Sequence, residues 1–287
     1  MKKYNILGVT RASIFSPNHI GNDGIIFNAT ADCLKEMGHK VTLRSEQEFL
    51  TTTLRADFVF TMLRSEASMN KLQQWEQKGT IAVNSAFGIA NCGREEMTQI
   101  LLKNHIPHPT SLIVNTDEYI IDQLKEKDIS FCWLKRGDGH AIHREDVSYA
   151  RHPQEAQELI AEFALRGIKR VVINNHLKGD LIKFYGVEGS PFFYWFYPFD
   201  QSHSKFGLEK INGKAKGLPF DLDKLKDICQ RSAHATNVKI FGGDCIVDEE
   251  GEIRIIDFND WPSFAPCRKE AAQTIAECII RTYNENE

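Results

Sequence analysis

Two apolar runs joined by an acidic turn, near the end of the chain, constrain its fold more than any other stretch. The runs are residues 243–247 and 253–258, and the turn between them contains one glycine. Apolar, β-rich runs on either side of such a turn predict a β-hairpin. Its loop is predicted to be either Glu250-Gly251 or the four residues 249–252.

Both loops give the same register. In it Asp244 lies opposite Asp257, and the alternation of side chains along a strand puts Asn259 on the face of Asp257. Facing Cβ atoms are about 5 Å apart, so two carboxylates there repel by roughly 3 kcal/mol at an effective dielectric constant near 20. Two carboxylates and an amide suit Mg²⁺, which removes this repulsion and also binds substrate phosphates. The alternative is a surface hairpin with solvated acidic residues, and a three- or five-residue loop would break the register.

At these residues the chain resembles the ATP-grasp superfamily, whose last strand pair carries an acidic residue followed by Glu-x-Asn or Asp-x-Asn and holds Mg-ATP. Asp244, Asp257 and Asn259 match the three ligands, and Pro262-Ser263 falls where many members have Pro-Gly. The chain looks like a RimK-type, carboxylate-amine-ligase-like member whose Asp-x-Asn motif is similar to that of inositol polyphosphate kinases. Most ligases of the superfamily carry Glu first, so the resemblance leaves the reaction type open.

Composition predicts an ordinary globular protein. The 287 residues are 42% hydrophobic and carry a formal net charge of -4, which gives no reason to expect a nucleic-acid partner. No apolar run approaches the roughly 18 residues of a membrane span, and the N-terminus lacks a signal sequence, so we expect a soluble, cytoplasmic protein without a membrane partner. The seven cysteines are scattered without a Cys-x-x-Cys pair, which predicts reduced core residues.

The first third of the chain alternates strands and helices, which predicts a parallel α/β unit. A helix ending before Gly38 is predicted to be capped by Asn22 or Asp23. Ligands collect at the carboxyl ends of parallel strands, where Arg11, His19 and Arg64 could hold an anionic group; ordinary solvated loops are the alternative. The predicted strands are 6–10, 41–43, 58–62 and 81–84, and the second predicted helix is 69–78.

Two further segments are similar to parts of the ATP-grasp fold. In the first, a helix after Gly93 runs into a Pro-rich joint, and Arg94 stands where a phosphate-contacting Lys often lies. In the second, Lys135 ends a strand and Gly137 and Gly139 follow it. A strand-borne Lys can reach α- and β-phosphates, and glycines let backbone amides approach phosphate oxygens. The resemblance implies that Lys135 is a nucleotide ligand under a phosphate-covering loop, whereas the residues alone also fit a plain hairpin.

An apolar strand begins at Val171, and residues 172–177 match the segment that contacts adenine between the two ATP-grasp lobes. Gly179, Asp180 and Lys183 resemble the start of the second lobe. Lys183 is either a substrate or phosphate contact or an exposed strand residue. The resemblance implies nucleotide contacts at Asn174, Asn175, His176, Leu177, Asp180 and Lys183.

The stretch 192–197 is densely aromatic and predicts a buried strand. The loop 203–217 holds four lysines and three glycines, and is either a solvated excursion or a lid over an anionic substrate, with Lys205 a candidate catalytic contact. Arg268, just after the metal motif, is another candidate. Amphipathic or apolar helices are predicted over 153–166, 222–235 and 267–283.

We therefore expect an α/β and α+β chain with three parts: an N-terminal parallel α/β domain (1–88), a central ATP-grasp lobe (89–173) and a C-terminal lobe with the metal site (174–287). The resemblance implies ATP and Mg²⁺ as cofactors and a small-molecule substrate, and the four lysines of the loop 203–217 indicate that this substrate is anionic. A carboxylate-amine ligase acting through an acyl phosphate is favoured, because most of the superfamily are ligases. A small-molecule kinase and a non-catalytic nucleotide-binding protein are the alternatives, and related folds often form homodimers.

Overall fold

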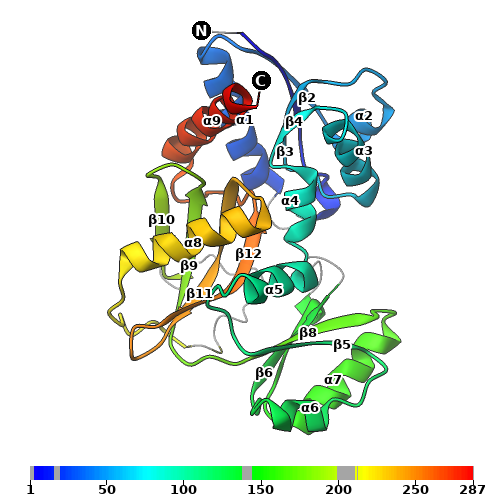
Figure 1. The fold of residues 1–287 in the computed structure, drawn as a ribbon, viewed down its shortest axis with the longest axis vertical. Coiled ribbons are helices and arrows are strands. Elements are labelled where there is room, and N and C mark those ends of the chain that lie inside the picture. Colours follow the sequence, from blue (N-terminus) through cyan, green and yellow to red (C-terminus); the bar gives the residue numbers. More distant parts are fainter. Residues whose placement is uncertain (1–2, 16–19, 138–143, 199–210, 212, 287) are drawn as a thin grey trace.

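Three four-stranded sheets, each with helices packed against it, make up the computed structural model, which describes residues 3–15, 20–137, 144–198, 211 and 213–286. The N-terminal sheet is at the top of Figure 1, the sheet formed by residues 180–260 is in the middle, and the third sheet is at the bottom. The mixture of one parallel and two antiparallel sheets confirms the predicted α/β and α+β class.

The N-terminal sheet is parallel, as predicted, with the strand order β2-β1-β3-β4. Gly38 has φ +90°, which confirms the predicted end of the first helix. The predicted cap is wrong, because that helix begins at Ile20 and the carboxylate of Asp23, in its first turn, pairs with Arg11 instead. The elements are β1 (Asn5–Val9), α1 (Ile20–Glu36), β2 (Lys40–Arg44), α2 (Glu46–Thr51), β3 (Phe58–Thr61), α3 (Glu66–Glu76), β4 (Ile81–Val83) and α4 (Ala86–Asn91).

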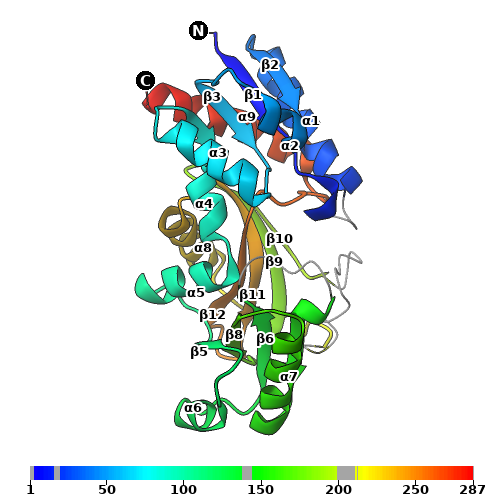
Figure 2. The same cartoon turned by 90° about the vertical axis from the view of Figure 1, so that its right-hand side faces the viewer.

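The central lobe is an antiparallel sheet with the order β5-β8-β6-β7, covered on one face by two helices (Figure 2). The longer helix begins at Pro153 as predicted, where a missing N–H costs nothing, and its apolar face buries Ala156, Ile160 and Phe163 against the strands. The elements are β5 (Ser111–Asn115), α6 (Ile121–Glu126), β6 (Cys132–Arg136), β7 (Val147–Ala150), α7 (Pro153–Leu165) and β8 (Arg170–Asn175).

The C-terminal sheet is antiparallel, with the order β10-β9-β11-β12. Its strands are β9 (Asp180–Val187), β10 (Phe193–Phe196), β11 (Ile240–Val247) and β12 (Ile253–Asp260), and α5 (Arg94–Lys103) and α8 (Leu222–Thr236) share a hydrophobic core with one face of it. The aromatic strand β10 lies at the edge of the sheet, so three of its four residues stay partly exposed and the predicted full burial is wrong.

The last helix, α9 (Arg268–Glu285), packs against elements from the beginning of the chain. It packs beside α1, and its apolar residues share a core with Tyr4, Ile26 and Phe60. Figure 1 shows both termini at the same end of the molecule. The N-terminal domain therefore takes its core from both ends of the sequence.

All seven cysteines lie in the described ranges; none is in a disulfide, and six are buried, as predicted. Among the helices of the described residues, none is both long and apolar enough to cross a membrane.

Candidate metal and nucleotide site

The facing carboxylates predicted from the sequence lie opposite each other in the structure. Asp244 on β11 pairs with Asp257 on β12 on one side and with Lys183 on β9 on the other. The Nζ atom of Lys183 lies 3.0 and 3.1 Å from the two carboxylate oxygens of Asp244. The three side chains therefore form one row across three adjacent strands.

Two irregularities together produce this register. Asp248 N–H donates to Glu252 O and Gly251 has φ +77°, so the loop holds three residues and neither predicted loop is correct. If the register set by this three-residue loop continued along both strands, Asp244 would lie opposite Ile256. A β-bulge after Asp244 inserts Ile256 as an extra residue and restores the pairing of Asp244 with Asp257.

The row lies on the sheet face that does not carry the helices. Cys245, Ile255 and Phe258 point to the other face, into the core shared with α5 and α8. The Asp244 and Asp257 side chains keep 24% and 20% of their surface exposed, so ligands can reach them. Asn259 pairs with Gly242, which is two residue pairs along the ladder from Asp244 and Asp257.

Two more cations reach this row from the preceding parts of the chain. Arg94, the first residue of α5, places Nη1 3.3 Å from a carboxylate oxygen of Asp257. Lys135, at the end of β6, donates from Nζ to the carbonyl oxygen of Ile256 at 2.9 Å. Burial lowers the pKa of Lys135 to about 8, with the charge of Arg94 adding to the shift and Asp257 opposing it.

The donor set fits Mg²⁺ better than a metal held entirely by protein ligands. Within the described ranges, no group of three or more His, Cys, Asp and Glu side chains could hold a metal ion. Two carboxylates and one amide leave coordination positions to water and phosphate, as is usual for Mg²⁺. Lys183 and Arg94 each neutralise one of the carboxylates, so the row tolerates its facing negative charges.

The predicted adenine-contacting segment forms the end of β8 and the residues after it. The amide of Asn174 is buried and directed inward, toward Ser111 Oγ at 2.8 Å and His108 Nε2 at 3.4 Å. His176 Nδ1 accepts a hydrogen bond from Trp133 Nε1 at 3.1 Å. Asn175 donates its N–H to Thr110 O. Nucleotide contacts of Asn174, Asn175, His176 and Leu177 stay predictions.

Asp180 has a role that the sequence did not indicate. Its two carboxylate oxygens accept the backbone N–H groups of Lys216 and Leu218, at 2.7 and 2.8 Å. This buried carboxylate thus anchors the chain at the end of the lysine-rich loop 203–217. Hydrogen bonds to residues 36 and 38 positions away leave no local sequence signal. A nucleotide contact of Asp180 stays a prediction.

The glycine loop after β6 is only partly described. Gly137 donates its N–H to Arg170 O, and a Cβ there would lie 3.0 Å from Arg170 Cβ, so this glycine permits close packing on β8. His19, Gly139 and Lys205 lie outside the described residues.

Two of the three other predicted basic residues, Arg11 and Arg64, meet at Asp260, the last residue of β12. Arg11 pairs with Asp23 at 2.9 Å and with Asp260 at 3.5 Å, and Arg64 also pairs with Asp260. Arg268 donates to Asn22. The side chains of Arg11 and Arg64 are about nine-tenths buried, so their ion pairs join the N-terminal domain to β12, and neither residue lies in the solvated loop that was the alternative.

Glu46 orders the loops that carry Arg11 and Arg64, and the sequence did not single it out. Its buried carboxylate accepts the backbone N–H groups of Ala12, Arg64 and Ser65 at 2.9 to 3.1 Å. This single side chain fixes the ends of β1 and β3 against each other.

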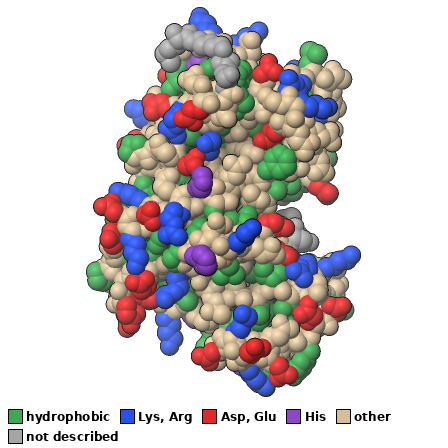
Figure 3. Space-filling model, in the orientation of Figure 1, with side chains coloured by type: hydrophobic (Ala, Val, Ile, Leu, Met, Phe, Trp, Pro, Cys, Tyr) green, Lys and Arg blue, Asp and Glu red, His purple; other side chains and the backbone are tan. Residues whose placement is uncertain are grey.

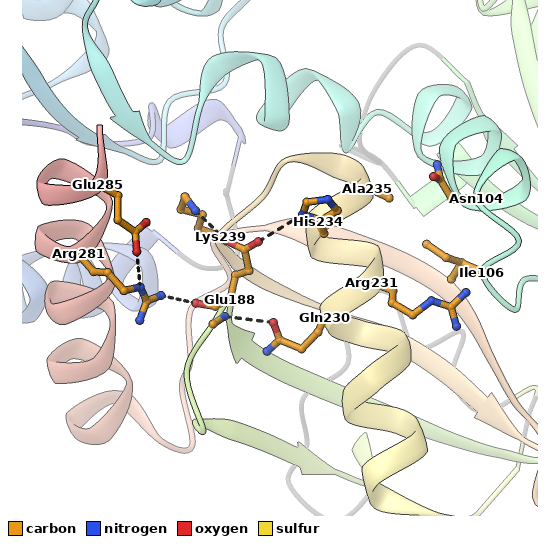
Figure 4. Close-up of a pocket in the computed structure, with 11 residues that line it drawn as sticks. Asn104, Ile106, Glu188, Gln230, Arg231, His234, Ala235, Lys239, Arg281 and Glu285 are labelled. Atoms are coloured by element: carbon orange, nitrogen blue, oxygen red, sulfur yellow. Dashed lines mark hydrogen bonds and ion pairs between the residues drawn. The ribbon is translucent and has the colours of Figure 1, made fainter. Parts of the chain in front are cut away.

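A pocket of about 680 Å³ lies on the helical side of the C-terminal sheet, between α8 and α9 (Figure 4). Its basic side chains have carboxylate neighbours: Lys239 pairs with Glu188 at 2.8 Å and Arg281 with Glu285 at 3.9 Å. Acidic and basic side chains are also interspersed over the surrounding surface (Figure 3). Of the predicted site residues that the structure describes, none lines this pocket.

Solved structures share this architecture over the whole chain. D-alanine-D-alanine ligase from Bacillus anthracis, complexed with ATP, has a TM-score of 0.69 at 13% identity and covers 99% of this chain and 98% of its own. D-alanyl-alanine synthetase A from Vibrio cholerae has a TM-score of 0.69 at 15% identity, and the match covers 98% of this chain and 99% of that one. The ATP-grasp ligase PsnB, complexed with a minimal precursor, has a TM-score of 0.62 at 16% identity, and the match covers 98% of this chain and 100% of that one. No protein-family model and no curated protein matches the sequence. The chain therefore has the fold of the ATP-grasp ligases.

Proposed function

We propose that this protein is an ATP-dependent carboxylate-amine ligase that binds Mg-ATP between its central and C-terminal lobes. The observation that carries the proposal is the row of Lys183, Asp244 and Asp257, with Arg94 and Lys135 brought to it from two other segments. Three cations and two facing carboxylates at one place suit a nucleotide triphosphate with its metal ion. The fold shared with ATP-grasp ligases supports this assignment.

Each group has a proposed part in binding. Asp244, Asp257 and Asn259 would hold Mg²⁺, which when bound offsets the negative charge of the phosphates. Arg94 and Lys135 would bind phosphate oxygens, and Lys183 would contact phosphate or substrate. Other proposed contacts are Gly137 and Gly139 for phosphate, residues 174–177 and Asp180 for the nucleoside, and Lys205 and Arg268 for the substrate.

The reaction needs positioning and charge neutralisation, and no protein nucleophile. A substrate carboxylate oxygen attacks the γ-phosphorus and ADP leaves, which gives an acyl phosphate. An amine nitrogen then attacks the acyl carbon, phosphate leaves, and the new amide nitrogen loses a proton. The cations of this site would lower the repulsion between the carboxylate and the γ-phosphate. They also favour an anionic substrate.

One observation favours a small-molecule kinase instead. The metal motif reads Asp257-Phe258-Asn259, with Asp first, and the same cations would serve a hydroxyl that attacks the γ-phosphorus in line. In the kinase reaction the γ-phosphoryl group stays on the substrate, whereas in the ligase reaction it is released as phosphate.

The destination of the γ-phosphate therefore tests the proposal. The protein is incubated with γ-labelled ATP, Mg²⁺ and a metabolite extract, and the label and new masses are followed together. A ligase releases the label as phosphate along with a condensed product. Label retained on a small molecule would show a kinase, and Mg-ATP binding without turnover in any extract would indicate a nucleotide-binding protein.

Asp257→Asn should lower Mg-ATP turnover by about 100-fold, because it removes one carboxylate from the metal site. Asn259→Ala should act in the same direction. The control is Glu250→Gln, an exposed residue of the turn in the same hairpin, which should behave like wild type. Wild-type turnover in Asp257→Asn and Asn259→Ala would contradict the metal assignment.

A further inference from the structure

The outer edge of β12 is held by the central lobe at one point. In the described part of the chain, β12 is an edge strand, so its outward backbone groups have no strand to bond with. Ile255 N–H donates to Pro107 O at 2.9 Å, and Ile255 O accepts from His108 Nδ1 at 2.6 Å. Lys135 Nζ holds the next carbonyl, that of Ile256, at 2.9 Å.

This point coincides with the bulge that places Asp257. Cys245 pairs with Ile255, and after the extra residue Ile256 the pairing resumes between Asp244 and Asp257. Without the bulge Asp257 would pair with Gly243, whose added Cβ would lie 2.6 Å from Phe184 Cζ, on the core face of the sheet. A one-residue slip exchanges the two faces of a strand. The carboxylate would then leave the metal row.

The imidazole of His108 suits this position in one tautomer. A carbonyl oxygen only accepts, so Nδ1 carries the proton and Nε2 is the acceptor that faces the amide of Asn174 at 3.4 Å. Burial, together with the charge of Lys135, lowers the pKa of His108 to about 4, so the ring is neutral near pH 7. Asn174 is fixed in turn by Ser111 Oγ at 2.8 Å.

We propose that His108 is a positioning residue of the metal site, which holds the β12 bulge at Ile255 and so keeps Asp257 in the row with Asp244. The proposal rests on the proposed function, since the metal is assigned there. His108 reaches no metal ligand directly. It fixes the backbone two residues before Asp257 and ties that backbone to β8 through Asn174.

Metal affinity tests the proposal without turnover. Mn²⁺ replaces Mg²⁺ as the probe, and free Mn²⁺ is measured by electron paramagnetic resonance in the presence of a non-hydrolysable ATP analogue. His108→Leu removes the donor, whereas the side-chain amide of His108→Asn offers an N–H where Nδ1 lies. We expect Mn²⁺ binding about tenfold weaker in the Leu variant and within about threefold of wild type in the Asn variant.

The controls separate positioning from general damage. Metal-free binding of the analogue, measured by calorimetry, should be retained in His108→Leu, and His234→Leu on α8 should leave Mn²⁺ affinity unchanged. Should the Leu variant not fold, His108→Gln replaces it, because its longer amide is displaced from the Nδ1 position and should bind Mn²⁺ more weakly than His108→Asn.

Two results would overturn the inference in different ways. If wild type binds no Mn²⁺ with the analogue, the metal site itself is wrong and the proposed function falls with it. If wild type binds Mn²⁺ and His108→Leu or His108→Gln binds it equally well, the proposed function stands and the positioning role is wrong.

Discussion

At the scale of single residues, Lys135 has the most unusual environment of the site. Its ammonium group is buried against a backbone carbonyl, near Arg94, and its pKa is lowered to about 8. The low pKa means that the positive charge, which the proposed phosphate contact requires, is lost just above physiological pH. Raising the pH and replacing Lys135 by an uncharged residue therefore remove the same positive charge.

We expect metal-free ADP binding to weaken as pH rises through about 8. Below that pH Lys135 is charged and holds phosphate; above it the amine must first gain a proton, so affinity should fall by up to about tenfold between pH 8 and 9. Calorimetric titrations between pH 6.5 and 9.5 measure this.

Lys135→Met is the matched variant, because Met keeps the unbranched chain without the charge. It should bind ADP more weakly at pH 7 and show no further loss between pH 8 and 9. An equal pH dependence in wild type and variant would assign the titrating group elsewhere. Unchanged ADP affinity at pH 7 would remove Lys135 from the phosphate site.

At the scale of secondary-structure elements, α4 and the end of α8 approach so closely that a side chain does not fit between them. A Cβ on Gly88 in α4 would lie 2.0 Å from the carbonyl oxygen of Asn237, which follows α8. Because that neighbour is backbone, the two helices would have to separate.

Gly88→Ala should therefore destabilise the protein by about 1 to 3 kcal/mol, measured by denaturant unfolding. The matched control is Gly24→Ala in α1, where no described atom outside the adjoining backbone of the helix lies within 4 Å of the added Cβ. That change should be neutral or stabilise by up to about 1 kcal/mol, since alanine favours helix more than glycine does. Equal changes in the free energy of unfolding for the two variants would show that helix propensity, and not the contact with Asn237, determines the effect of Gly88→Ala.

The hairpin shows how far an element can be predicted from its own residues. The β-rich runs and the period-2 alternation correctly paired Asp244 with Asp257. The loop length was wrong, and a bulge at Ile256 compensates for it. His108 and Lys135, which lie outside the hairpin, contact the strand at this bulge, and a hairpin sequence read alone does not contain those contacts.

At the scale of the whole molecule, Asn84 joins the N-terminal domain to the strand that carries Asp244. It is fully buried, its side-chain oxygen accepts the N–H groups of Lys239 and Ile240 at 2.9 Å, and its amide donates to Ile240 O at 2.8 Å. A second link runs through Asp260, paired with Arg11 and Arg64.

Asn84→Ala should lower the free energy of unfolding by about 3 kcal/mol, because it leaves one buried and one partly buried N–H group without an acceptor. Asn91→Ala is the control; it removes a single bond, to Thr236 O at 3.0 Å, and should cost about 1 kcal/mol. Chemical unfolding of both variants measures the difference. A loss no larger in Asn84→Ala than in Asn91→Ala would mean that this junction contributes little to stability.

The sequence by itself determined the elements and their order. Pro153 at the start of α7, Gly38 after α1 and the alternation in β11 and β12 are local signals, because they act through backbone geometry and side-chain periodicity within a few residues. Together with the resemblance to ATP-grasp proteins, they were enough to predict the fold and to name most of the residues now found around the metal row.

Only the tertiary structure decided which partners those residues have. Arg94 reaches Asp257 across 163 positions, and His108 reaches Ile255 across 147. Arg11 proved to be engaged with Asp23 and Asp260, and α9 packs on the domain at the other end of the chain. Contacts of this kind depend on how sheets and helices stack, and they leave no periodic or local pattern from which they could be read.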